Sequence, residues 1–184
     1  MTEITIRELT ADEALNSLND LTEILHATVN SGASVGFILP YSMNDSRTFW
    51  QNVVFLSLKD GKGIFLVAVI QDKVVGTVQL SLQMPPNQSH RGEITKLLVH
   101  PEFRNQGIAR QLMRAVEKRA RDLGKSLLTL DTRTGDTAEP LYTSLGFQTA
   151  GVIPGYCRAP ETDRYDATTY MYKALHKSKI NDTY

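Results

Sequence analysis

The chain has 184 residues, of which 41% are hydrophobic, enough for one well-packed core but short for two. Its 20 basic residues balance 20 acidic residues, so no overall basic field draws it to nucleic acid or to an anionic membrane. A single cysteine, Cys157, excludes an intrachain disulfide and a multi-cysteine metal site, and the four histidines lack metal-ligand spacing.

The N-terminal residues lack the basic and then apolar layout of a signal peptide, and no apolar run approaches the ~20 residues of a membrane helix. We therefore expect a soluble, cytoplasmic protein that binds neither membrane nor nucleic acid and holds no metal. Cys157 is expected to be a partly buried thiol.

The first half of the chain predicts one strand, two helices and a loop. Apolar and polar residues alternate over 4–9, which is typical of a strand. Thr10 and Glu13 have capping-box spacing before an apolar stripe that ends near residue 30. The small, apolar and glycine-rich stretch 32–42 predicts a loop of the kind that lines pockets. A second helix, mostly buried, is predicted over roughly 44–59.

The middle of the chain predicts a hairpin, a third strand and a crossover. Apolar runs at 64–70 and 74–82 are joined by three polar residues and predict the hairpin. Residues 92–99 form the next predicted strand, which the proline at 101 closes. A helix then runs to about Leu123, where Gly124 stops it, and 126–132 read as a buried strand. Strand, helix and strand in succession predict a right-handed crossover between parallel strands.

The last third predicts a short helix and two closing strands. Asp136 and Glu139 repeat the capping spacing before this helix, and Pro140 is tolerated only in its first turn. The closing strands are predicted over 147–152 and 167–174. The element order predicts a mixed α/β (α+β) sheet in a single domain over residues 1–175, followed by a tail over 176–184.

One stretch, Arg104-Asn105-Gln106-Gly107-Ile108-Ala109, lies where a predicted strand stops and a helix begins. The first turn of a helix leaves backbone N–H groups without partners, and Gly107 lets a ligand approach them. A pyrophosphate therefore fits here. A Walker loop and a dinucleotide fingerprint are both excluded, because the stretch has one glycine and no Gly-Lys-Ser/Thr.

The stretch matches the pattern Arg/Gln-x-x-Gly-x-Gly/Ala. Together with Leu97-Leu98-Val99-His100-Pro101 before it and Leu141-Tyr142-Thr143-Ser144-Leu145-Gly146-Phe147 after it, it resembles the Gcn5-related N-acetyltransferase (GNAT) family. Other stretches resemble the tabtoxin-resistance subgroup of that family: Gly32-Ala33-Ser34-Val35-Gly36-Phe37, Gln79-Leu80-Ser81-Leu82, Leu130-Asp131-Thr132, Ala138-Glu139 and Pro154-Gly155-Tyr156-Cys157.

The resemblance implies the GNAT fold, in which a mostly antiparallel sheet contains one splayed parallel strand pair. It implies acetyl-CoA as cosubstrate and a primary amine as acceptor, which attacks the thioester directly. Pantetheine would bond to backbone groups of Leu97, Leu98 and Val99, whose side chains also suit core packing. The Leu97 amide would stabilise the oxyanion.

The resemblance also assigns the phosphate contacts. The pyrophosphate would be held by Arg104, Asn105, Gln106, Gly107, Ile108 and Ala109. Arg110 and Arg114 would either meet phosphate or form a solvated helix face. Gly135 stands where many members have an asparagine, so any cofactor contact there would come from the backbone.

The proposed chemistry needs a base, because an alkyl amine with a pKa near ~10 is mostly protonated at neutral pH. Glu93 and Asp131 are the candidates, and the sequence does not decide between them. Glu93 could also be an ordinary exposed strand charge, and Asp131 a cap of the following loop. Tyr142 matches the family tyrosine that protonates the leaving thiolate, the alternative being a core aromatic.

The acceptor pocket is expected between the loop 32–41 and the segment 154–160, with Ser34, Val35, Phe37 and Tyr156 as contacts. The expected acceptor is a small-molecule amine such as an amino-acid-like toxin or antibiotic, which would make antibiotic resistance the physiological role. Protein or peptide N-acetylation and a non-catalytic acyl-CoA sensor are the alternatives. The sequence is compatible with a monomer or a homodimer.

Overall fold

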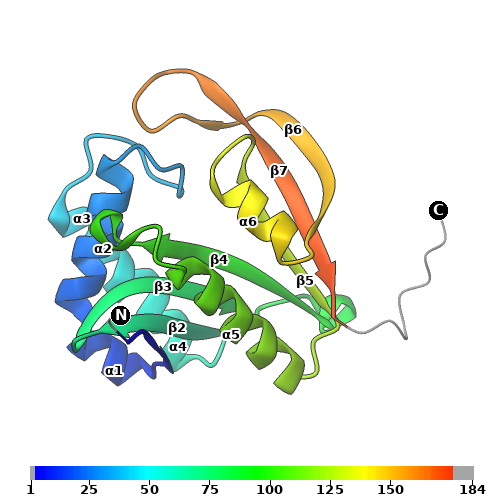
Figure 1. The fold of residues 1–184 in the computed structure, drawn as a ribbon, viewed down its shortest axis with the longest axis horizontal. Coiled ribbons are helices and arrows are strands. Elements are labelled where there is room, and N and C mark those ends of the chain that lie inside the picture. The colour runs from blue at the N-terminus through cyan, green and yellow to red at the C-terminus, as the bar shows by residue number, and fades with distance from the viewer. Residues whose placement is uncertain (1–2, 176–184) are drawn as a thin grey trace.

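Residues 3–175 are described by the computed structural model, and the predicted tail at 176–184 lies outside them. Within this range seven strands form one sheet in the order β1-β2-β3-β4-β5-β7-β6. In the half of the sheet that contains β1 to β4, helix α5 crosses one face and helices α1–α4 cover the other, as Figure 1 shows. The strands are β1 (Thr5–Glu8), β2 (Gly63–Ile70), β3 (Lys73–Ser81), β4 (Arg91–Val99), β5 (Leu127–Arg133), β6 (Gln148–Arg158) and β7 (Tyr165–Ala174). The α-helices are α1 (Ala11–Asn16), α2 (Leu18–Asn30), α3 (Met43–Phe49), α4 (Phe55–Lys59), α5 (Ile108–Asp122) and α6 (Ala138–Ser144).

The predicted mixed sheet is confirmed. Strands β4 and β5 are parallel, and every other neighbouring pair is antiparallel. Helix α5 connects the parallel pair, as the strand, helix and strand order predicted. The β2–β3 hairpin is also confirmed, with a turn of two residues, Gln71 and Asp72. Both have positive φ, which fits the right-handed twist of the flanking strands.

The first predicted helix is divided at Ser17. The capping box of Thr10 and Glu13 is present at its start, as expected. The Ser17 hydroxyl donates to the Glu13 carbonyl at 3.2 Å, and a serine that bonds back to the preceding turn competes with the helix ladder. The chain leaves helical geometry at this residue and resumes it in α2.

The second predicted helix contains an irregular middle and is less buried than expected. A π-helical turn, η1 (Trp50–Val54), separates α3 from α4. The indole of Trp50 is fully buried and donates to the Leu21 carbonyl at 2.7 Å, which ties the turn to α2. Val53 and Leu56 are each 54% exposed, so the prediction that this apolar stretch is buried around most of its circumference was wrong.

Two predictions in the last third need correction. Asp136 does not cap α6: its carboxylate accepts from the backbone N–H of the next residue, Thr137, which is itself the N-cap without a side-chain bond. Strand β6 is longer than the predicted 147–152 and runs to Arg158. Its neighbour β7 begins at Tyr165, before the predicted 167. Pro140 does lie in the first turn of α6, as its chemistry requires.

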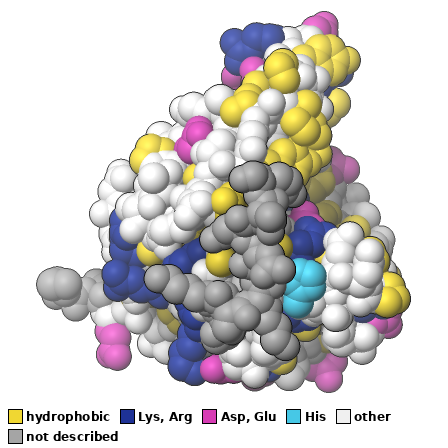
Figure 2. Space-filling view, turned by 90° about the vertical axis from the view of Figure 1, so that its right-hand side faces the viewer, with side chains coloured by type: hydrophobic (Ala, Val, Ile, Leu, Met, Phe, Trp, Pro, Cys, Tyr) yellow, Lys and Arg dark blue, Asp and Glu magenta, His cyan; other side chains and the backbone are white. Residues whose placement is uncertain are grey.

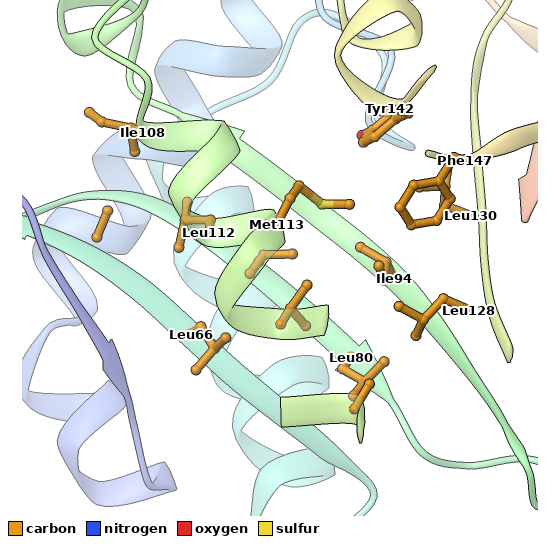
Figure 3. Close-up of a cluster of buried hydrophobic side chains, with 14 of the residues drawn as sticks. Leu66, Leu80, Ile94, Ile108, Leu112, Met113, Leu128, Leu130, Tyr142 and Phe147 are labelled. Carbon is orange, nitrogen blue, oxygen red and sulfur yellow. The ribbon is translucent and has the colours of Figure 1, made fainter. Parts of the chain in front are cut away.

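Two apolar clusters lie on opposite faces of the sheet. One packs α5 and α6 against the sheet and includes Leu112, Met113 and Leu128, as Figure 3 shows. The other packs α1–α4 against β2 and β3 and includes Trp50 and Phe65. Because apolar residues are needed on both faces, β2 reads as an unbroken hydrophobic run from residue 64 to 70.

Candidate active site

The parallel strands β4 and β5 separate after three residue pairs. Arg91, Gly92 and Glu93 pair with β5, the last opposite Thr129, and from there the described part of β5 pairs with β7 alone. Arg91 joins the two strands where they part, donating to the Thr129 hydroxyl at 2.9 Å. The two ribbons diverge beyond this point in Figure 1. The predicted splayed pair therefore exists, and it opens toward the N-terminus of α5.

Strand β4 carries a bulge inside this opening. Thr77 of β3 pairs with Leu98 and Gln79 pairs with Thr95, so two β4 residues face one β3 residue. Lys96, in the bulge, has φ of 50°, a conformation that is uncommon for a residue other than glycine. The bulge changes which face the side chains take. Leu98 is buried on the α2 side, whereas Leu97 and Val99 pack toward α5.

The predicted pyrophosphate loop lies at the open end of the parting strands. Gly107 is the N-cap of α5 with φ of 79°. Because glycine has no side chain, no capping hydrogen bond covers the N–H groups of the first turn. A methyl group added at Gly107 would meet no atom within 4 Å, so the backbone is open to a ligand. Asn105 and Gln106 are exposed, while Ile108 is buried in the core. The helix start is therefore accessible at its backbone and anchored by Ile108.

The arginines around this loop point in different directions. Arg104 turns back, donating to the Val99 carbonyl at 3.4 Å and to the Ser31 hydroxyl at 3.2 Å. Arg110 reaches across to α6 and donates to the Ser144 hydroxyl at 2.9 Å. Arg114 is exposed on α5. Two of the three arginines thus connect the helix start to neighbouring elements.

Gly135 lies in the turn before α6, and its N–H donates to the Glu139 carboxylate at 2.8 Å. The residue has φ of 78°, and an added methyl group would meet no atom within 4 Å. It borders a pocket of about 450 Å³ whose lining is Gly135, Asp136, Glu139, Pro140, Thr143 and Ser144. The pocket lies beside the Arg110 contact on α6.

Tyr142 is buried at the α6 edge of the α5-face cluster, with its ring centre 6.0 Å from that of Phe147 (Figure 3). Burial raises the pKa of its phenol, and the charges of Asp131 and Asp136 raise it further. Tyr142 is therefore both a core aromatic and a protonated hydroxyl near Asp131.

The two carboxylates predicted as bases lie on one face of the sheet. Glu93 pairs with Thr129, and Asp131 is two residues further along β5, so their side chains point to the same side. Asp131 pairs with Tyr170 of β7. A hydrogen bond with Tyr156 raises the pKa of Tyr170 to about 12, burial raises it too, and the Asp131 and Glu93 charges add to this. The structure thus brings both carboxylates near Tyr170, whose hydroxyl lies 2.6 Å from that of Tyr156.

The predicted acceptor loop is held by contacts from several elements. The Ser34 hydroxyl lies 3.7 Å from the Cys157 thiol, and the Leu39 N–H donates to the Pro160 carbonyl at 2.9 Å. The two segments predicted to form the pocket are therefore neighbours. Phe37 packs against Tyr41 and Phe49, with ring centres 4.7 and 5.1 Å away. Phe37 is thus a packing residue of this loop.

Lys96 is a residue that the sequence reading missed. Its ammonium donates to the Val35 carbonyl at 3.0 Å and lies about 5.5 Å from the ring centres of Phe37 and Phe49. Burial lowers the pKa of Lys96, with the charge of Asp131 acting in the opposite direction. Its sequence signal was a lysine inside an otherwise apolar strand segment, between Ile94 and Leu98.

A second pocket, of about 260 Å³, lies between Glu93 and the residues of η1 and α4, and the sequence did not predict it. Its lining combines polar side chains of β3 and β4 with apolar side chains of η1, α4, β2 and β3. The side-chain amide nitrogen of Gln79 is buried there without a partner among the described residues. The lining is Val53, Val54, Ser57, Leu58, Gly63, Ile64, Gln79, Leu80, Ser81, Glu93 and Thr95. Gln79 and Ser81 belong to a stretch that carries the resemblance to the tabtoxin-resistance subgroup, but nothing in the sequence marked them as lining a pocket.

The described range, residues 3–175, contains neither a metal-ligand cluster nor a membrane-spanning helix. No group of three or more histidine, cysteine, aspartate or glutamate side chains there could hold a metal ion. None of the helices in this range combines the length and the hydropathy needed to cross a bilayer.

Comparison with known proteins adds a family and several relatives. A sequence model of the Acetyltransferase (GNAT) family matches residues 25–147. Human N-acetyltransferase 8B is 39% identical over 107 residues, 57% of this chain and 47% of its own length. An uncharacterised N-acetyltransferase from Azospirillum brasilense is 28% identical over 142 residues, 76% of this chain and 82% of its own length. The match thus spans about half of the human relative.

Solved structures share the fold at low sequence identity. An N-acetyltransferase from Staphylococcus aureus has a TM-score of 0.78 at 17% identity, covering 95% of this chain and all of that one. A Salmonella typhimurium protein described as an acetyltransferase, solved with its cofactor acetyl-CoA, has a TM-score of 0.75 at 20% identity. Coverage there is 98% of this chain and 99% of the other.

Proposed function

Because the chain belongs to the Acetyltransferase (GNAT) family, we propose that it transfers an acetyl group from acetyl-CoA to the primary amine of a small molecule. The observation that carries the proposal is the parting of β4 from β5 after the Glu93 and Thr129 pair, with the α5 start at the open end. This arrangement offers free strand backbone and helix N–H groups to one extended ligand.

The described residues fit acetyl-CoA at both ends of the opening. At Gly107 the helix start has open space for a pyrophosphate, whose charge the N–H groups and helix dipole favour. Along β4, the edge from Ile94 to Val99 has no β5 partner, so its backbone is available to pantetheine. Arg110 and the pocket beside Gly135 lie next to the helix start and would flank the phosphates.

Acetyl-CoA, when bound, supplies the thioester that the amine nitrogen attacks. In this proposal Glu93 or Asp131 accepts a proton from the incoming ammonium, which frees the nitrogen lone pair. The Leu97 N–H donates to the carbonyl oxygen as negative charge develops on it. Tyr142 gives its proton to the sulfur as the carbon–sulfur bond breaks, and the second proton that leaves the nitrogen restores the Tyr142 hydroxyl through solvent, so the products are an amide and free thiol. Its raised pKa keeps this hydroxyl protonated at neutral pH.

The pocket beside Glu93 supports a small acceptor. It joins a carboxylate to apolar walls, so it suits the ammonium and the carbon chain of one small molecule. The loop containing Ser34, Val35 and Phe37 is bonded to the segment after Tyr156, and neither segment lines this pocket. An amino-acid-like toxin or antibiotic is the acceptor we propose, in line with the resemblance to the tabtoxin-resistance subgroup.

Two other functions remain as alternatives. A protein or peptide acceptor needs an open groove for an extended chain, and the bonds from Ser34 to Cys157 and from Leu39 to Pro160 oppose one here. A non-catalytic acyl-CoA sensor would have no use for the carboxylates and the buried phenol near the opening. The two alternatives predict different results when thiol release from acetyl-CoA is measured.

The test measures thiol release from acetyl-CoA with amino acids, dipeptides, aminoglycosides, polyamines and tabtoxinine-like β-lactams as acceptors. Turnover with a small amine is expected, and Tyr142→Phe should lower kcat by roughly 10²-fold or more while acetyl-CoA binding persists. Tyr165→Phe, at an exposed hairpin tyrosine, is the matched control and should leave kcat unchanged.

Other outcomes point elsewhere. Tight acetyl-CoA binding without turnover on any acceptor would favour the sensor. Turnover on dipeptides alone would favour peptide acetylation. Unchanged kcat in Tyr142→Phe would remove this phenol from the mechanism.

A further inference from the structure

Thr77 is a fully buried threonine of β3 whose hydroxyl donates to the Lys96 carbonyl at 2.9 Å. The acceptor belongs to the bulge of β4, where regular pairing between the strands is interrupted. A side chain thus takes the place of a backbone donor where the bulge leaves the ladder irregular. This contact connects the interior of the sheet to the residue with positive φ.

The contact fixes the direction of the next N–H group. The peptide bond between Lys96 and Leu97 is trans and planar, so its C=O and N–H point in opposite directions. The Thr77 hydroxyl holds the carbonyl toward β3. The Leu97 N–H must then point away from β3, to the side that β5 has left.

We propose that Thr77 is a positioning residue, which aims the Leu97 N–H at the carbonyl oxygen of the thioester. This inference rests on the proposed function, because it assigns a bound acetyl-CoA to the opening between β4 and β5. Without the Thr77 hydroxyl, the Lys96–Leu97 peptide plane can rotate about ψ of Lys96 and φ of Leu97. The N–H then no longer points at the oxygen.

The opposite end of Lys96 is held as well. Its ammonium donates to the Val35 carbonyl and lies over the rings of Phe37 and Phe49. The residue is therefore fixed at its carbonyl from β3 and at its side chain from the loop after α2. Thr77 controls the peptide orientation, whereas the side-chain contacts control where the residue lies.

The test is infrared difference spectroscopy of acetyl-CoA labelled with ¹³C at the acetyl carbonyl, bound to purified protein. A hydrogen bond from Leu97 lowers the carbonyl stretching frequency below that of free acetyl-CoA. In Thr77→Val, which keeps the shape and removes the hydroxyl, the frequency should return toward the free value. Thr77→Ser keeps the hydroxyl and should retain the wild-type frequency.

The matched control is Thr22→Val. Thr22 is equally buried, and its hydroxyl donates to the Leu18 carbonyl at 2.6 Å within α2, away from the opening. The Thr22→Val variant also loses a buried hydrogen bond from a threonine hydroxyl to a backbone carbonyl, and it should leave the stretching frequency of the thioester carbonyl unchanged. Calorimetry should give acetyl-CoA dissociation constants within about threefold for all variants, and kcat should fall roughly 10²-fold only in Thr77→Val.

The results separate this inference from the proposed function. Wild-type protein that binds no acetyl-CoA overturns both. Binding with the same carbonyl frequency in wild type and Thr77→Val overturns the role of Thr77 alone. If Thr77→Val does not fold, the NMR chemical shift of the Leu97 amide proton in the wild-type protein provides the test instead. This shift should differ between the acetyl-CoA and CoA complexes, and an identical shift would refute the proposal.

Discussion

Lys96 is a lysine in the middle of a strand whose neighbours Ile94 and Leu98 are core residues. Its ammonium lies near two aromatic rings and donates to a backbone carbonyl. Such contacts partly replace hydration, so the charge is tolerated at a cost.

The cost predicts a pH dependence of stability. Burial lowers the pKa of Lys96 in the folded protein below its ordinary value of 10.5. Between the lowered pKa and 10.5 the unfolded chain binds more protons than the folded one, so the free energy of unfolding rises with pH in that window. Relative to Lys96→Met, the wild type should therefore gain stability as the pH rises from 7 toward 10.5.

Urea denaturation of both proteins at several pH values measures this difference. The stability gap must change in the stated direction within the window. A gap that is constant from pH 7 to 10.5 would mean that the Lys96 ammonium is as well solvated in the folded protein as in the unfolded chain.

At the scale of elements, α5 offers a comparison between its two ends. Gly107 at its start and Gly124 just after its end both have positive φ, and an added methyl group meets no atom within 4 Å at either position. Alanine at either site adopts a left-handed conformation, which costs roughly 1–2 kcal/mol. The two substitutions are matched in backbone strain and differ in their distance from the opening.

We predict that Gly107→Ala weakens acetyl-CoA binding about tenfold or more, because a methyl group obstructs a charge-assisted hydrogen bond worth roughly 1.5–3 kcal/mol. Gly124→Ala should lose similar stability and keep its affinity. Calorimetric titration with acetyl-CoA and thermal melts of the free proteins provide the two readouts. Equal affinities would place the pyrophosphate elsewhere.

The longest strands of the C-terminal half, β6 and β7, form a hairpin that projects from the body, and Figure 2 shows hydrophobic side chains gathered on it. Exposed apolar residues there include Val152, Ile153, Tyr156 and Tyr165. The sequence predicted shorter strands because Pro154 and Gly155 interrupt the alternation. Pairing with β7, through an irregular register between Ile153 and Cys157, carries β6 past them.

At the scale of the whole molecule, one charged cluster joins the C-terminal half to α5. The Lys173 ammonium of β7 lies 2.6 Å from the Glu117 carboxylate, each side chain 19% exposed, and also donates to the Leu145 carbonyl. Arg121 adds a second ion pair to Glu117 at 2.8 Å. Burial raises the pKa of Glu117, but the bonds from Lys173 and Arg121 outweigh it, so the pKa is lowered overall.

Glu117→Gln should therefore destabilise the protein by roughly 2 kcal/mol at pH 7, because a half-buried Lys173 loses its counter-charge. A lowered carboxylate pKa stabilises the folded state above the unfolded-state pKa, near ~4.5, and this contribution is lost as the pH falls through the folded-state pKa. The difference from wild type should shrink accordingly in denaturation curves below pH 4.5.

Glu8→Gln is the control for this prediction. Glu8 of β1 forms an exposed ion pair at 2.8 Å with Arg119, which lies on α5 as Glu117 does. An exposed pair contributes roughly 0–1 kcal/mol, so its loss should be small. If the two variants lost the same stability, the Glu117 cluster would have no special role in joining β7 to α5.

The sequence by itself determined the element order, the hairpin, the parallel crossover and the loop at 104–109. These depend on apolar periodicity, turn residues and caps, all of which act over a few neighbouring positions. The resemblance likewise predicted the fold and the family, because the motifs on which it rests are contiguous in sequence. Errors arose where caps competed, as at Asp136, or where apolar residues were assumed buried, as at Val53.

Only the tertiary structure decided how the site is assembled. Arg91 meets Thr129 across 38 positions, Lys96 meets Val35 across 61, and Thr77 meets Lys96 across a bulge. Strand pairing and burial create these contacts, and they depend on where β5 leaves β4. A local pattern carries no information about that point, because it is set by the packing of α5, α6 and β7 against the rest of the sheet.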